Sequence, residues 1–248
     1  MGTTETRSLI RCKEIHMKKT ILHATWATVA VLSLVACGGG DDASPQGGPP
    51  IVVNADGTTN FDSTKLATSL SALPLEDLSD AEKTSRAYMR EEEKLAYDVY
   101  TQLDMSWGGQ VKVFGNIAKS EATHTEAVRQ LLLRYSLPDP AANLTAGMFA
   151  NATLQQLYLD LLQQGTPSLV EALQVGAQIE ELDIVDIQKA LETVDNQDIR
   201  LVYDSLMKGS RNHLRSFAKT LAQQGATYTP QYLSLDAYTA IVSTPIER

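Results

Sequence analysis

Cysteine and histidine are scarce in this chain of 248 residues. The only cysteines are Cys12 and Cys37, so disulfide bonds and thiolate-bound metals are excluded from the long remainder of the chain. Of the four histidines, two stand at positions 16 and 23, close to the N-terminus. Any site that needs imidazole in the rest of the chain must therefore use His124 or His213.

Basic residues are also few, with 21 lysines and arginines against 30 aspartates and glutamates. The imbalance grows when residues 1–36 are set aside, because they hold five basic residues and only two acidic ones. The remaining chain has 16 basic and 28 acidic residues and a net charge of −12. A surface of this sign repels a phosphate backbone, which argues against nucleic acid as a partner.

The apolar run near the N-terminus is short. It follows Lys18 and Lys19 and leads through small residues to the sequence LVAC at residues 34–37. A transmembrane anchor is the alternative interpretation, but the run falls short of the ~20 apolar residues that a span needs. A basic start, an apolar run and a small-residue end are typical of a secretory signal peptide. Residues 34–37 resemble the lipobox of bacterial lipoproteins, which implies lipidation of Cys37.

This resemblance sets our expectations for the N-terminal region and for location. Residues 1–36 are predicted to be a leader and lipoprotein signal peptide, in which residues 1–16 precede a second possible start at Met17. The protein would then lie in the cell envelope of a Gram-negative-type bacterium, held to the membrane by its N-terminal lipid and facing the periplasm. Gly38 stands where a retention signal for the inner membrane would have aspartate, which favours the outer membrane.

The region after Cys37 is predicted to be a tether. Its first part, GGGDDASPQGGPP, is too rich in glycine, proline and acid to build a core. Residues 51–75 contain one short strand-like run at 51–53 and one short helix. We therefore assign residues 37–77 to a flexible tether and residues 78–248 to a single folded domain.

The folded domain is predicted to be all-α. Apolar residues recur with a helical period in four long segments, at about 80–105, 111–135, 168–194 and 197–224. Short turns join the first two and the last two, whereas about thirty residues with a short helix near 153–164 separate the pairs. A four-helix bundle with one long crossover in its middle is the topology of ferritin-like proteins.

Every long helix carries a ligand-type residue within its apolar stripe. In the first helix we place Glu92 on the stripe, Glu91 off it and Glu93 at its margin. In the third helix Glu180 faces the core, whereas Glu181 falls among glutamines and is expected to be solvated. The predicted metal ligands from the four helices are Glu92, Glu121, His124, Glu180, Asp183 and His213.

Burying several carboxylates together is costly unless positive charge compensates them. A bound cation with carboxylate and imidazole ligands would compensate them all at once. The alternative is a metal-free network of ion pairs and hydrogen bonds. Its cations would come from Arg86, Arg90, Arg129, Arg211 and Arg215.

The order Glu, then Glu-x-x-His, then Glu, then His resembles the ferritin-like carboxylate-bridged di-iron proteins, in which two helices each give a Glu-x-x-His motif. Carried over, Glu92 matches the first glutamate, Glu121 and His124 the first motif, and His213 the last histidine. Ser210 stands where the second motif has its glutamate. We therefore expect one tight metal site and a second that is weaker or empty.

A closer resemblance covers about residues 78–232. The segments MREEEKLAYDVY, NIAKSEATH, GAQIEELDI and GSRNHLRSF are similar to a bacterial ferritin-like family catalogued as domain of unknown function 2202. The superfamily implies iron, mononuclear or dinuclear, and oxidation of Fe(II) or reduction of dioxygen or peroxide. The alternative is a non-enzymatic module of the envelope that binds metal, senses it or interacts with other proteins. We expect Tyr88, Asp183 and Asn212 to orient the histidine rings.

Overall fold

The computed structural model describes residues 50–248. The predicted leader and Cys37 lie outside the described residues, so their assignments remain predictions. Within residues 50–248 the protein is mostly helical, with one small antiparallel sheet. No helix in this range combines the length and apolar character needed to cross a membrane.

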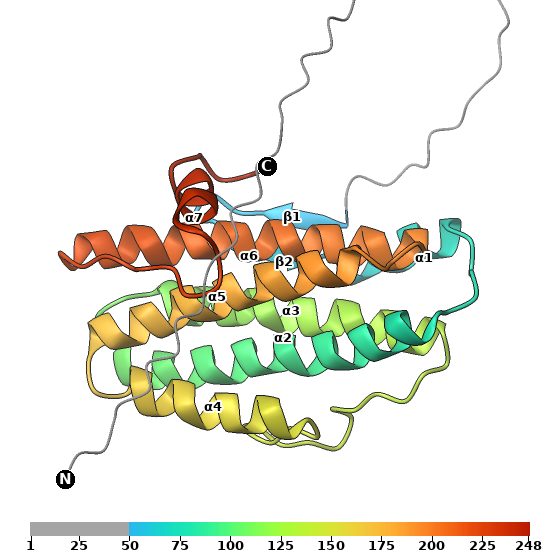
Figure 1. The fold of residues 1–248 in the computed structure, drawn as a ribbon, viewed down its shortest axis with the longest axis horizontal. Coiled ribbons are helices and arrows are strands. Elements are labelled where there is room, and N and C mark those ends of the chain that lie inside the picture. Colours follow the sequence, from blue (N-terminus) through green and yellow to red (C-terminus); the bar gives the residue numbers. More distant parts are fainter. Residues whose placement is uncertain (1–49) are drawn as a thin grey trace, which may run out of the picture. The chain divides into compact units, whose positions relative to one another are not determined.

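Four long helices run side by side through the molecule (Figure 1). The helices α2 and α3 form one antiparallel hairpin, and α5 and α6 form the other. Contacts of α3 with α6 and of α2 with α5 join the two hairpins. The prediction of four long helices is confirmed, with bounds α2 (Asp80–Trp107), α3 (Val113–Arg134), α5 (Leu169–Leu191) and α6 (Gln197–Gln223).

Side-chain caps explain where several helices begin. Ser79 and Glu82 form a reciprocal capping box at the start of α2, and Ser168 accepts a hydrogen bond from the third residue of α5. The crossover contains the expected short helix, α4 (Ala152–Gly165), which Asn151 caps. This helix packs against α2 and α5, so α2 is covered on a third side.

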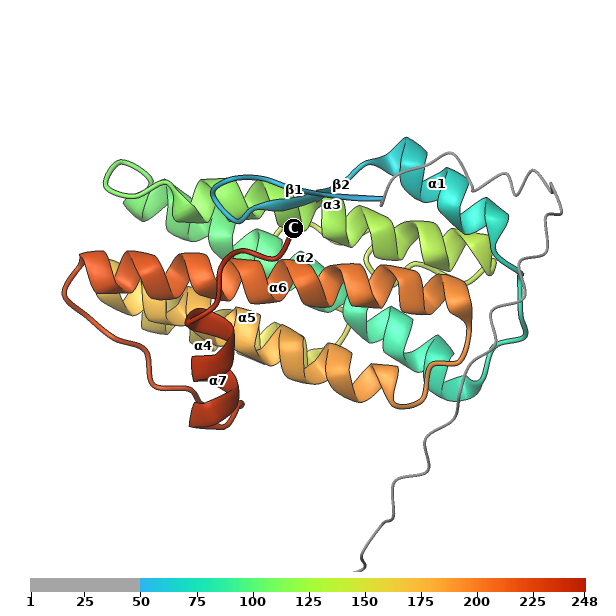
Figure 2. The same ribbon diagram turned by 90° about the horizontal axis from the view of Figure 1, so that it is seen from above.

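Residues 51–72 do not form the flexible tether that we expected. Strands β1 (Ile51–Val53) and β2 (Thr59–Phe61) pair as a hairpin, and α1 (Ser63–Ala72) follows it. Figure 2 shows the hairpin lying over α3 and α6. Its backbone is fixed there, because the amides of Thr59 and Phe61 donate to the side chains of Ser120 and Thr123 on α3. The folded region therefore includes residues ahead of 78.

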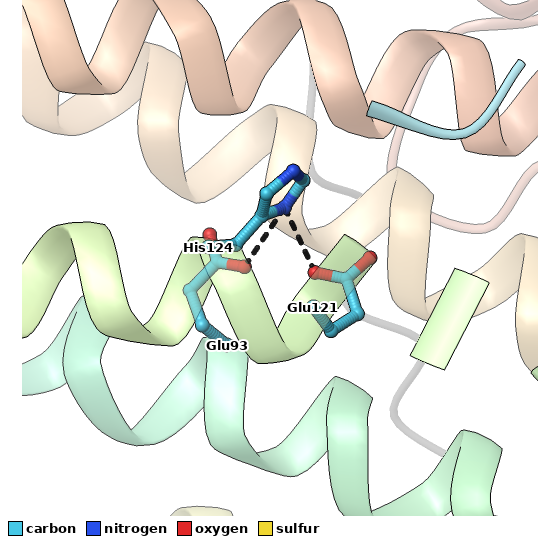
Figure 3. A group of neighbouring side chains, drawn as sticks. All are labelled: Glu93, Glu121 and His124. Carbon is cyan, nitrogen blue, oxygen red and sulfur yellow. Dashed lines mark ion pairs between the residues drawn. The ribbon is translucent and has the colours of Figure 1, made fainter. Parts of the chain in front are cut away.

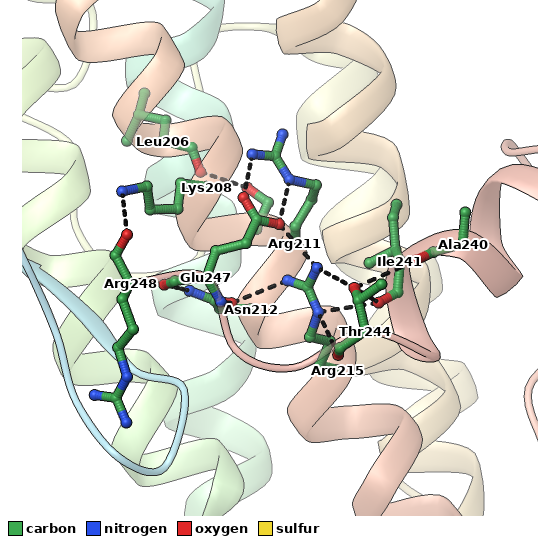
Figure 4. A network of polar contacts seen from close by, with 11 residues as sticks. Leu206, Lys208, Arg211, Asn212, Arg215, Ala240, Ile241, Thr244, Glu247 and Arg248 are labelled. Carbon is green, nitrogen blue, oxygen red and sulfur yellow. Dashed lines mark hydrogen bonds and ion pairs between the residues drawn. The ribbon is translucent and has the colours of Figure 1, made fainter.

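The C-terminal segment closes over the outer side of α6. After α7 (Leu235–Val242), the tail brings Glu247 to the guanidinium groups of Arg211 and Arg215 (Figure 4). The shortest of these contacts is 2.6 Å, from Nη2 of Arg211. Arg248 then reaches the carbonyl of Val53 in β1. The beginning and the end of the described chain therefore meet beside α6.

Candidate metal centre

Two groups of side chains meet between the long helices, and Glu121 belongs to both. The first group is Glu93, Glu121 and His124, and the second is Glu121, Glu180 and His213. In each group, one ligand-type atom from each residue lies within 4.8 Å of the others, and all five residues are buried. Each of the four long helices contributes at least one of these residues.

Each carboxylate oxygen of Glu121 faces a different histidine. Oε2 lies 2.9 Å from Nδ1 of His124, and Oε1 lies 2.8 Å from Nδ1 of His213. Glu93 adds an oxygen 3.5 Å from the first ring, and Glu180 adds one 3.5 Å from the second. Figure 3 shows the carboxylates of Glu93 and Glu121 directed at one ring nitrogen of His124. The site thus has two matching halves, each with one imidazole nitrogen, one oxygen of Glu121 and one further carboxylate.

Many of these atoms have no hydrogen bond among the residues that the structure describes. They are both carboxylate oxygens of Glu92, Glu93 and Glu121, Oε2 of Glu180, Oδ1 of Asp183 and Nδ1 of His213. The contact between Glu121 and His213 is short but lacks hydrogen-bond geometry. Buried polar atoms are normally paired, so a cluster of convergent unpaired oxygens calls for a ligand between them. Carboxylates and imidazoles together suit a divalent cation.

The two histidines carry the positive charge that the site holds without a metal. Burial opposes protonation of His213, but the carboxylates of Glu180 and Glu121 outweigh it and raise its pKa to about 9. The pKa of His124 is also raised, because Glu121 and Glu93 outweigh its burial. Burial acts to raise the pKa of Glu121, yet the two imidazoles dominate and lower it. Glu121 is therefore ionised between two imidazolium rings.

The pKa values of the other carboxyl groups are raised instead. Burial raises the pKa of Glu93 to about 8, with a further contribution from Glu121. Burial, followed by Asp186 and Glu93, raises the pKa of Glu92 well above its usual range. The pKa of Asp183 is raised by burial and then by Glu92. A cation that binds here would displace several protons.

Four of the six predicted ligands come together as expected, namely Glu121, His124, Glu180 and His213. Glu92 and Asp183 are buried close by, with 1% and 2% of their surface exposed, but belong to neither group. Glu93, which the sequence analysis put at the margin of the stripe, occupies the position expected for Glu92. The spacing of Glu93 indicates that it faces the core, because it lies four residues after Met89 and three before Ala96, both of which are buried.

The prediction that Glu181 is solvated is wrong, and Glu91, which was placed off the stripe, is buried as well. Glu91 is buried and accepts hydrogen bonds from the amides of Ala150 and Asn151 at the start of α4. Glu181, expected to be solvated, is also buried. It accepts hydrogen bonds from the hydroxyl of Tyr228 and from the amides of residues 231–233. Both carboxylates fix loops that the helical pattern alone does not place.

Four of the five arginines proposed for the alternative network form ion pairs elsewhere, and the guanidinium of Arg86 has no hydrogen-bond partner in the described part of the chain. Arg90 pairs with Asp139, Arg129 with Glu126, and both Arg211 and Arg215 with Glu247. Arg86 lies over the ring of Tyr135, 4.9 Å from its centroid. Within residues 50–248, no ion pair joins an arginine or lysine to any of the six predicted ligands or to Glu93. Among residues 50–248, lysine and arginine side chains therefore do not compensate the charge of the clustered carboxylates.

The residues expected to orient the histidine rings do not contact them through hydrogen bonds. Tyr88 donates to Asp186, and Asn212 bonds to the C-terminal segment. Instead, Nε2 of both rings meets Thr59 in the N-terminal hairpin. On the other side of the site, the hydroxyl of Tyr100 donates to Oε1 of Glu180 at 2.7 Å, which leaves Oε2 directed at His213.

A surface cavity of about 790 Å³ lies between the first half of α2 and the end of α5. Tyr88 and Asp186 form part of its lining, and the tyrosine hydroxyl donates to Oδ2 of Asp186 at 3.2 Å. Asp186 is close enough to Glu92 to contribute to that group's raised pKa. A series of acidic groups therefore leads from this cavity towards the buried cluster.

This helical protein has a buried glutamate–histidine cluster. Comparison with known proteins shows to which family it belongs. Residues 82–245 match the family described as "Uncharacterized protein domain (DUF2202)", and the chain belongs to this family. The resemblance found from four sequence segments is thereby confirmed at the level of the family. The family's description names no activity. All the residues of both groups lie inside the matched range, whereas the hairpin and α1 lie outside it.

The chain is similar to the uncharacterized protein MJ0754 of Methanocaldococcus jannaschii. It is 48% identical over 179 residues, which cover 72% of this chain and 96% of the relative. The crystal structure of that hypothetical protein superimposes with a TM-score of 0.68 and covers 71% of this chain and 99% of its own. The similarity extends over nearly the whole relative.

Proposed function

We propose that this protein binds divalent metal, with iron favoured, at the buried cluster of Glu93, Glu121, Glu180, His124 and His213. The observation that carries the proposal is the set of convergent carboxylate oxygens for which residues 50–248 supply no arginine or lysine partner. Unpaired carboxyl groups at this depth destabilise the fold unless a cation or protons compensate them. Oxygen and imidazole ligands in this mixture are typical of iron and similar divalent metals.

We infer a ferritin-like arrangement for the four long helices. Two antiparallel hairpins joined by one long crossover, with inward ligands from every helix, support this assignment. Glu93 on α2 and Glu180 on α5 take the places of the single glutamates. Glu121 and His124 on α3 form the Glu-x-x-His motif, and His213 on α6 stands without a partner glutamate.

The matched halves of the site support two metal ions per chain rather than one. We expected a weak second site because Ser210 replaces a glutamate, and Ser210 indeed turns its hydroxyl to the carbonyl of Leu206. Glu93 compensates for this loss, because it gives the half around His124 a carboxylate of its own. Glu121 would serve both halves, since its two oxygens face the two histidines separately.

Bound iron would supply one-electron redox chemistry towards dioxygen or peroxide. The carboxylates and imidazoles around it would be its ligands, and each carboxylate would bind in its ionised form. Glu93 holds a proton up to about pH 8 in the metal-free protein and would release it on binding. Tyr100 fixes Glu180 by its hydrogen bond and thereby keeps one carboxylate oxygen directed into the site.

Metal analysis of the purified protein tests this proposal. We expect up to two ions per chain in anaerobic titration with Fe²⁺, and Glu121→Gln should weaken binding at least ~10-fold. Glu126→Gln is the matched control, since Glu126 lies on the same helix but pairs with Arg129 at the surface. Failure of the wild type to bind any metal would refute the proposal. Consumption of Fe²⁺ with dioxygen or peroxide over many turnovers would identify a catalyst, and uptake without turnover a binding protein.

We also propose that the protein is held at a membrane of the cell envelope through lipid on Cys37. The sequence LVAC at residues 34–37, after a basic and apolar leader, supports this. Cys37→Ser should release the protein from the membrane fraction and leave its helical content unchanged. Recovery of the wild-type protein in the soluble periplasmic fraction would contradict the proposal.

A further inference from the structure

Thr59, in the N-terminal hairpin, lies between the two histidines of the site. Its hydroxyl oxygen is 3.2 Å from Nε2 of His124 and 3.2 Å from Nε2 of His213. Its backbone carbonyl oxygen is 2.9 Å from Nε2 of His124. Thr59 is fully buried, so no water competes for these contacts at its surface. One residue of the hairpin thus reaches the outward nitrogen of both rings.

The donors and acceptors in these contacts can be assigned. A carbonyl oxygen only accepts, so Nε2 of His124 must carry the proton that points to Thr59. A hydroxyl oxygen has two lone pairs and can accept from Nε2–H of His213. With a proton on Nε2, the neutral form of each ring has its lone pair on Nδ1, which is the atom that faces Glu121.

The surroundings hold Thr59 in this place. Its amide donates to Ser120 on α3 at 3.1 Å, and Phe61 two residues later packs edge-on against the ring of His124. Gly209 on α6 makes room for the contact, because a Cβ there would come within 2.7 Å of the ring of His124 and 2.8 Å of the hydroxyl of Thr59. The rings of His124 and His213 can therefore stack, 5.4 Å apart, with Thr59 at their edge.

We propose that Thr59 is a positioning residue that fixes both histidines with Nε2 protonated and Nδ1 directed at the metal, so that the hairpin completes the site. This inference deepens the proposed metal binding and rests on it. Hydrogen-bond partners of ligating histidines set the ring orientation and the nitrogen that binds metal. The two rings depend on Thr59 unequally, since His124 also has the carbonyl whereas His213 has only the hydroxyl.

This difference between the two histidines can be tested in the full-length chain. In Thr59→Val, a substitution of nearly the same shape, the ring Nε2–H of His213 should exchange with water at least ~10-fold faster, whereas that of His124 should stay protected. Nitrogen-15 NMR of histidine-labelled, metal-free protein measures both signals. Titration with Fe²⁺ or Zn²⁺ should show about 10-fold weaker binding. Thr59→Ser keeps the hydroxyl and should restore wild-type behaviour in both measurements.

Thr58→Val is the matched control. Thr58 is buried in the same hairpin but bonds to Asn54 and Asp56, so its loss loosens the turn without removing a contact to either histidine. If Thr58→Val reproduces the effects of Thr59→Val, hairpin stability explains them and the inference is overturned. Unchanged ring signals and affinity in Thr59→Val would also overturn it. If the wild type binds no metal, the proposed function fails, and the ring signals still decide whether Thr59 orients the histidines.

Discussion

Three consecutive glutamates on α2 show how one helix can direct adjacent side chains to different tasks. Successive residues on a helix point about 100° apart, yet Glu91, Glu92 and Glu93 are all at least 98% buried. This is possible because α2 is covered by α3, α4 and α5. Glu91 fixes the start of α4, Glu93 faces the histidine on α3, and Glu92 lies towards Asp186 on α5.

Glu93 should therefore decide how many metal ions bind. Glu93→Gln removes one carboxylate from the half of the site around His124 and leaves the half around His213 intact. We expect the metal content to fall from about two ions to about one, because the weakened half loses roughly 10- to 100-fold in affinity. Metal analysis after dialysis against a fixed free concentration measures this. A second substitution, Glu91→Gln, should leave metal content unchanged while lowering stability.

Much of the candidate site could be predicted from the sequence, and the reason why Glu92 was chosen over Glu93 is physical. Helical phase predicts that Glu121, His124, Glu180 and His213 come together, because they interrupt the otherwise apolar stripes of α3, α5 and α6. The stripe of α2 is wider, since that helix packs against three neighbours, and phase alone does not rank adjacent glutamates within it. Thr59 could not be anticipated, because its contacts come from a hairpin 61 to 154 residues away in sequence.

At the scale of elements, the long periodic helices were predicted more completely than the short segments. The bounds of α2 and α6 agree with the predicted ranges to within two residues. In contrast, β2 and α7 were not predicted, and β1 and α1 were expected as a strand-like run and a short helix but assigned to a tether. These short elements are stabilised by contacts with distant parts of the chain, such as Glu247 with α6, rather than by their own periodicity. Contacts with another distant segment, Tyr228 and residues 231–233, explain why Glu181 is buried.

Glu181 should accordingly matter for stability and not for metal. Its carboxylate accepts from one hydroxyl and three backbone amides in the segment that follows α6. Glu181→Gln replaces an acceptor oxygen by a donor group, which leaves buried amides unpaired. We expect a loss of roughly 2–4 kcal/mol in the free energy of unfolding. Urea denaturation measures this, and Glu192→Gln, at an exposed position, should change it by less than about 0.5 kcal/mol.

At the scale of the whole molecule, the buried cluster makes the metal-free folded protein bind protons that the unfolded chain releases. His213 has a pKa of about 9 in the fold against an ordinary value of 6.5, so its stabilising effect is complete below about pH 6.5 and is lost as pH rises through 9. Glu93 stays protonated up to about pH 8, whereas the unfolded chain ionises near 4.5. Both groups make the folded state bind more protons than the unfolded state.

The metal-free protein should consequently lose stability as pH rises. Between pH 5.5 and 9 we expect the free energy of unfolding to fall by roughly 2 kcal/mol or more. Urea denaturation in the presence of a chelator measures this dependence, and Glu93→Gln should flatten the part of it below pH 8. With saturating metal the trend should weaken or reverse, because the ion takes the place of the protons. A metal-free stability that rises over this interval would contradict the assigned protonation states.

The position of the hairpin also has a practical consequence for choosing the fragment boundaries when proteins of this family are expressed. The family match begins at residue 82, but the described structure includes the hairpin from Ile51 onward. A fragment trimmed to residues 82–245 would retain every carboxylate and both imidazoles of the cluster and still lack the acceptor at the edge of the rings. Such a fragment could fold as helices and give misleading metal stoichiometries. Expression boundaries for relatives should therefore be placed by tracing which upstream segment reaches their histidines.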